Sequence, residues 1–130
     1  MKKTDTTDAW LSVLYVTLLL FDVAHVPEQW LTNWDWVESH GFGGWLTRRI
    51  HLLIVAAIPG LYRVFAGRFH AELTLVYGAI HVIHGSVHLW EAIAKSAFVP
   101  GLYGGLASLF FGAAVVGVSI VERRRQRAAA

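Results

Sequence analysis

The chain has 130 residues, of which 55% are hydrophobic and 15% charged, and its mean hydropathy is +0.49. In soluble domains about a quarter of the residues are charged. The composition of this chain therefore excludes an ordinary soluble domain and indicates one integral membrane domain over residues 1–130. The net charge of +2 comes largely from four arginines near the C-terminus, which argues against a nucleic-acid partner. The absence of cysteine excludes disulfides and thiolate chemistry, so any metal must be held by nitrogen and oxygen.

Four apolar segments predict an all-α, four-helix transmembrane bundle. The expected helices cover approximately residues 9–26, 48–67, 72–93 and 99–122. The first segment is about 27 Å long at 1.5 Å per residue, enough to cross a hydrocarbon core of roughly 30 Å once. Pro59-Gly60 in the second predicts a kink or a break. A stripe of small residues in the fourth, Gly104, Ser108 and Gly112, is typical of close packing between helices.

The segment between the first two helices is rich in tryptophan. It reads PEQWLTNWDWVESHGFGGW. Tryptophan prefers the headgroup layer of a bilayer, and Pro27 can open a helix on which Trp30 and Trp34 share a face. We therefore expect this loop or helix to lie along the membrane interface.

Lysine and arginine are distributed unequally between the two predicted sides. The side with both termini and the second loop holds eight of them, namely Lys2, Lys3, Arg63, Arg68, Arg123, Arg124, Arg125 and Arg127. The opposite side holds three: Arg48, Arg49 and Lys95. Because positive residues are retained on the cytoplasmic side, we expect a protein of the cytoplasmic membrane with both termini in the cytoplasm.

Ionisable residues from three predicted helices gather at one level of the membrane. They are Asp22 and His25 on the first helix, Glu28 just after it, His51 on the second, and His81, His84, His88 and Glu91 on the third. At 100° per residue, the four on the third helix span an arc of about 80°. Ionisable side chains are costly against lipid, so this stripe should face the bundle interior, where Asp22 and His25 can meet it.

Imidazole and carboxylate groups without sulfur suit a transition metal such as zinc or iron. The HxxH and HxxxH spacings place donor nitrogens on one helical face, as a metal site requires. The predicted ligands are His25, His51, His81, His84 and His88. The carboxylates Asp22, Glu28 and Glu91, together with His25, are the predicted catalytic groups, because they can orient the ligating rings or act as a base.

Other functions fit the same residues. Without a metal, a histidine paired with a carboxylate can move a proton onto or off an apolar, lipid-like small molecule. A non-enzymatic membrane subunit is the alternative, either a haem-binding anchor or a protein that handles ions or protons. Below His81 the third helix offers only Tyr77 and Thr74, which favours a pocket over a pore. The oligomeric state is left open.

The sequence resembles the HXXEE family of bacterial integral membrane proteins, whose function is not established. The similarity lies in His25-Val-Pro-Glu28-Gln29, in YGAIHVIHGSVH of the third helix and in FVPGLYGGL before the fourth. Gln29 stands where the family has its second glutamate. The resemblance implies that His25, Glu28 and the histidines of the third helix are functional, and it implies no substrate.

Overall fold

The computed structural model describes residues 6–32, 54–99 and 101–128. These residues form α1 (Thr6–Thr32), a shorter helix over Ile54–Ala66, α3 (Ala71–Lys95) and α4 (Leu102–Ala128), and within them there is no strand. The all-α class is therefore confirmed. Two of the described helices, over Thr6–His25 and Leu102–Ala128, are long and apolar enough to cross a membrane.

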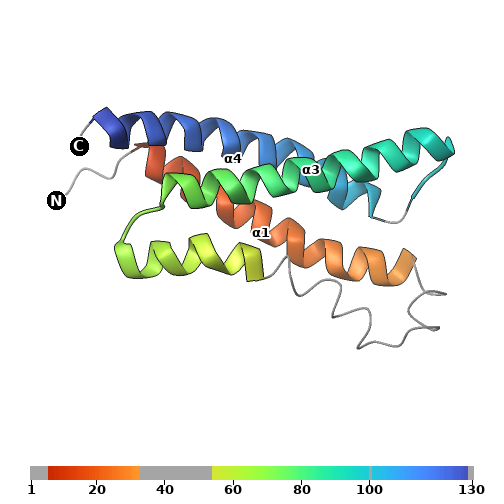
Figure 1. Cartoon of the computed structure of the whole chain (residues 1–130). Helices are drawn as coiled ribbons and strands as arrows, with labels where there is room; N and C mark the ends of the chain where they lie inside the picture. Colours follow the sequence, from red (N-terminus) through yellow and green to blue (C-terminus); the bar gives the residue numbers. More distant parts are fainter. Residues whose placement is uncertain (1–5, 33–53, 100, 129–130) are drawn as a thin grey trace.

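Successive helices run in opposite directions, so that the start of α1 and the end of α4 lie at the same end of the bundle, called the terminal end here (Figure 1). The closest packing joins α3 to α4, and α1 also packs against α4. Between α1 and α3 the contacts are made by long side chains, among them Tyr15 with Tyr77 and Asp22 with His81. This space between α1 and α3 is where the polar residues lie.

The buried residues of α1 repeat at alternating spacings of four and three. Leu11, Tyr15, Leu18, Asp22 and His25 are all buried. This is the heptad spacing that keeps one face of a helix directed at its neighbours. Asp22 and His25 thus occupy the last two positions of an otherwise apolar or aromatic seam, and the seam turns both side chains inward.

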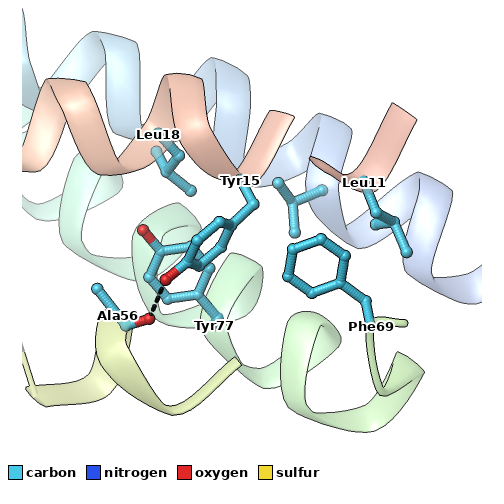
Figure 2. Close-up of a cluster of buried hydrophobic side chains, with 7 residues drawn as sticks. Leu11, Tyr15, Leu18, Ala56, Phe69 and Tyr77 are labelled. Carbon is cyan, nitrogen blue, oxygen red and sulfur yellow. Dashed lines mark hydrogen bonds between the residues drawn. The ribbon is translucent and has the colours of Figure 1, made fainter. Parts of the chain in front are cut away.

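The same seam forms the hydrophobic core at the terminal end of the bundle. Figure 2 shows Leu11, Tyr15 and Leu18 of α1 facing Phe69 and Tyr77. The ring of Tyr15 lies 5.2 Å from that of Phe69 and 5.4 Å from that of Tyr77, measured between centroids. The core therefore separates the polar residues of the site from the end where both termini lie.

Proline does not end either of two helices. The first helix does not end at Val26, because α1 continues through Pro27 to Thr32. Proline removes one intrahelical hydrogen bond, but the residues after Pro27 include Glu, Gln and Leu, which favour helix. The helix over Ile54–Ala66 likewise continues through Pro59 without a break. There the hydroxyl of Tyr15 donates to the Ala56 carbonyl and ties this helix to α1 (Figure 2).

Glycines set the distance between α3 and α4. A Cβ atom added to Gly112 would lie 2.9 Å from the Gly78 carbonyl oxygen, and one added to Gly85 would overlap the Gly105 carbonyl. Further along, the Ser119 hydroxyl donates to the Thr74 hydroxyl at 2.9 Å, and both residues are fully buried. The stripe of small residues on α4 is thus the packing surface for α3, as its spacing predicts.

Candidate functional site

Three histidines from two helices converge near the end of the bundle opposite the termini. His25 comes from α1, whereas His84 and His88 come from α3. One ligating nitrogen from each lies within 4.8 Å of the others, and the Nε2 atoms of His25 and His84 are 3.4 Å apart. Within the part of the chain that the structure describes, this is the group of three side chains arranged to hold a metal ion.

The rings of the three histidines contact one another edge to face. The centroid of the His25 ring is 5.4 Å from that of His84 and 5.4 Å from that of His88, and the His84 and His88 rings are 4.8 Å apart. His25 is buried, and the other two are partly buried. The cluster is therefore compact and largely shielded.

Local geometry explains why the histidines meet. His84 and His88 are four residues apart, so they project from the same face of α3. Gly105 of α4 leaves space for His88, because a Cβ atom at Gly105 would lie only 2.6 Å from the Cβ of His88. On α1, the heptad seam brings His25 to the same face as Asp22.

Asp22, His81 and Tyr77 form a second polar cluster, about one helical turn closer to the core. His81 Nε2 lies 2.8 Å from Asp22 Oδ1, and the Tyr77 hydroxyl donates to Asp22 Oδ2 at 2.9 Å. His81 Nδ1 lies 2.9 Å from the Tyr77 backbone carbonyl oxygen. The exposed fraction is 1% for His81 and Tyr77 and 7% for Asp22, so all three are buried.

Both ring nitrogens of His81 face oxygen atoms, so this ring is held at two points. Asp22 is held in the same way, because its carboxylate contacts His81 Nε2 and also accepts from the Tyr77 hydroxyl. The buried polar groups of this cluster therefore satisfy one another.

Five of the predicted site residues are brought together by the structure, in two clusters rather than one. The metal-compatible group contains His25, His84 and His88, and the second cluster contains Asp22 and His81. Glu91 lies on α3 but belongs to neither. The side chain of Glu28 and the whole of His51 lie outside the described residues.

Two residues of the site were missed by sequence reasoning about function. Tyr77 was noted only as a polar residue below the histidines, although it precedes His81 by four residues and so shares its face. Gly105 makes room for His88, but a glycine gives no signal of its own for such a role. The sequence signal that could have indicated this role is the Gly104-Gly105 pair, on a helix predicted to pack against the one that carries the histidines.

A separate set of charges lies at the terminal end of the bundle. Glu72 at the start of α3 pairs with His70 at 3.1 Å and with Arg123 of α4 at 3.3 Å. Its own backbone N–H is the main cause that holds the pKa of Glu72 below its usual range, and His70 and Arg123 add to the effect. Nearby, Asp8 pairs with Arg63 at 3.2 Å. These ion pairs join α3 to α4 and α1 to the helix over Ile54–Ala66.

Comparisons of the chain with family models, curated proteins and solved structures find no match.

Proposed function

We propose that this chain is a membrane-embedded protein whose site binds one transition-metal ion through His25, His84 and His88. The observation that supports this most directly is the convergence of three imidazole nitrogens from two helices within 4.8 Å. In tetrahedral zinc sites the metal–nitrogen distance is about 2.0–2.1 Å, which separates two ligands by roughly 3.3 Å. The 3.4 Å between the Nε2 atoms of His25 and His84 fits that value.

Three histidines leave a fourth position for water or substrate, which is the arrangement of catalytic rather than structural zinc sites. The bound ion would supply Lewis acidity and a water of lowered pKa. The chain's own contribution is to hold three rings together and to keep Asp22 and His81 one turn away. We therefore propose an enzyme that performs metal-assisted or acid and base chemistry on an apolar small molecule.

The outer surface supports placement in a membrane. Large apolar side chains point outward along the helices, including Phe65, Phe110 and Leu20, with exposed fractions of 86%, 71% and 63%. Soluble monomers rarely expose so many contiguous apolar groups. In our proposal, α3 and the segment that contains the shorter helix complete a four-span bundle with both termini in the cytoplasm.

The ring contacts favour a metal ion over haem. A haem with two axial histidines places the porphyrin plane between the two imidazoles. Here each histidine ring of the cluster touches the other two, with centroids no more than 5.4 Å apart. No plane is open between them for a macrocycle.

The buried hydroxyl groups of Thr74 and Ser119 favour a closed pocket over a channel for ions or protons. Ser119 donates to Thr74, and the Thr74 hydroxyl lies within hydrogen-bond distance of the backbone carbonyls of His70 and Ala71. This chain of hydrogen bonds ends on the backbone. It therefore links α3 to α4 and does not form a route for protons or ions from His81 towards the terminal end.

Elemental analysis of the purified protein tests the proposal. The wild-type chain is expected to retain about one metal ion per chain, and the double variant His84→Ala/His88→Ala is expected to retain none, because one imidazole cannot hold the ion. His70→Ala is the matched control, since His70 lies at the other end of α3 and pairs with Glu72. Equal metal content in the double variant and the wild type would overturn the assignment.

A further inference from the structure

A small apolar pocket lies between α1 and α4, beside the histidine cluster. Its volume is about 200 Å³, and it is lined by Phe21, Ala24 and His25 of α1 and by Tyr103 and Gly104 of α4. His25 is shared between this pocket and the metal-compatible cluster. A molecule in the pocket would therefore lie against the site.

The lining limits what the pocket can hold. Among the described residues that line the pocket, the ionisable groups are the His25 imidazole and the Tyr103 phenol, and none is a carboxylate, lysine or arginine that could neutralise a charged ligand. Burying an unpaired charge is costly. Apolar cavities of roughly 150 Å³ accept benzene, so this pocket has room for a small ring or a short hydrocarbon chain.

The position of the pocket indicates the route of entry. Phe21 and Tyr103 are exposed on the outer surface of the bundle, at the mouth of the pocket. They belong to α1 and α4, the two described helices that are long and apolar enough to cross a membrane. Small residues, Ala24 and Gly104, leave the space between the helices open. The mouth therefore faces lipid.

We infer that the pocket binds an uncharged amphiphile, a molecule with a short apolar body and one hydroxyl or carbonyl group, which enters sideways from the bilayer. The apolar body contacts Phe21 and Tyr103, and the polar group reaches the imidazole of His25. This inference rests on the proposed function, because it is the proposed metal centre that gives the polar group a reactive partner.

Photolabelling tests this with a defined probe, an octanol that carries a diazirine. In the purified protein in lipid nanodiscs, labelling is expected to saturate on residues 21–25 and 103–104, as mapped by mass spectrometry. In metal-free protein, unlabelled octanol should compete with the probe, whereas octanoate should not, because no lysine or arginine is among the described residues that line the pocket. Labelling that never saturates and spreads over all lipid-facing residues would overturn the inference. Equal competition by octanoate and octanol in the metal-free protein would overturn the requirement for an uncharged ligand.

Filling the pocket is the second arm of the experiment. Ala24→Phe places a ring in the space and should lower saturable labelling at least about tenfold, the loss that corresponds to about 1.4 kcal/mol of binding free energy. Ala9→Phe is the matched control, since Ala9 is exposed on the same helix and far from the pocket. Gly104→Val fills the pocket from α4 and serves if the first variant does not fold. Undiminished labelling in a folded, filled variant contradicts the inference.

The two proposals fail separately. Ala24→Phe should keep its metal content, because it leaves all three histidines in place. The double variant His84→Ala/His88→Ala should lose the metal yet keep saturable labelling, because neither residue is among those that line the pocket. If the wild type holds no metal but labels saturably, the metal proposal fails and the pocket stands. If the wild type holds metal but does not label saturably, the pocket inference fails and the metal proposal stands.

Discussion

At the scale of single residues, His81 is held at both of its ring nitrogens. Its two ring nitrogens are fixed by the Tyr77 carbonyl and by the Asp22 carboxylate, 2.9 and 2.8 Å away. Neither nitrogen is directed at the neighbouring cluster of three histidines. In the proposed site, His81 is therefore the partner of a buried carboxylate, and the other three histidines hold the metal.

We predict that the contacts of Asp22 stabilise the folded protein. In Asp22→Ala, His81 Nε2 and the Tyr77 hydroxyl both lose their buried partner, so the protein should lose about 1–3 kcal/mol of unfolding free energy, measured by detergent titration. Unchanged stability in this variant would contradict the role of the buried cluster.

At the scale of helices, the contact between α3 and α4 determines where two of the histidines lie. Added Cβ atoms at Gly105 and Gly112 would lie 2.6 Å from the Cβ of His88 and 2.9 Å from that of His81. The same glycines that let the helices approach therefore define the space in which the histidine rings are oriented.

Gly105→Ala tests this dependence. The added methyl group must displace His88 or push the helices apart, so we expect a loss of about 1–3 kcal/mol of unfolding free energy and weaker metal retention. Gly117→Ala is the matched control on the same helix, because a Cβ at Gly117 has nothing within 4 Å. It should be neutral or stabilising by up to about 1 kcal/mol. Stability can be measured by detergent titration, and equal effects of the two variants would rule out the steric role of Gly105.

The junction of α3 with α4 at the terminal end should respond to acid. The folded protein lowers the pKa of Glu72, so the contribution of this group to stability is present above its ordinary pKa of 4.5 and is lost as the pH falls through the lower folded value. Stability measured from neutral pH downward should therefore decline less steeply in Glu72→Gln than in the wild type. Identical pH profiles would show that Glu72 contributes nothing to this dependence.

At the scale of the whole molecule, the parts that could be predicted are those set by local periodicity. The face shared by His81, His84 and His88 follows from 100° per residue, and the inward direction of Asp22 and His25 follows from the cost of charge in lipid. The division into two clusters could not be predicted, because it depends on the register of α1 against α3. The same holds for Gly105, whose role exists only across a helix contact.

The helix boundaries show the same limit. Local rules end a helix before proline, yet α1 passes through Pro27 and the shorter helix passes through Pro59. The Tyr15 hydroxyl that ties Ala56 to α1 comes from 41 residues away in the sequence, so no local rule contains it.

The arrangement of the ends in Figure 1 predicts which segments share a side of the membrane. The chain has no cysteine, so single cysteines can be introduced cleanly. Ala128→Cys and Ala66→Cys should react with an impermeant maleimide from the cytoplasmic side, and Ala97→Cys, in the turn after α3, from the opposite side. Reaction of all three from one side would exclude the four-span bundle.

The central claim is that three histidines hold one metal ion, and X-ray absorption spectroscopy of the metal-loaded protein tests it most directly. We predict three imidazole nitrogens at about 2.0–2.1 Å from the metal, as in zinc sites with three histidines, with an oxygen donor in the remaining position. Each of the variants His25→Ala, His84→Ala and His88→Ala should remove one imidazole or the metal itself, while His70→Ala should leave the spectrum unchanged. A metal with fewer than three imidazole ligands, or a spectrum that none of the three substitutions alters, would contradict the account.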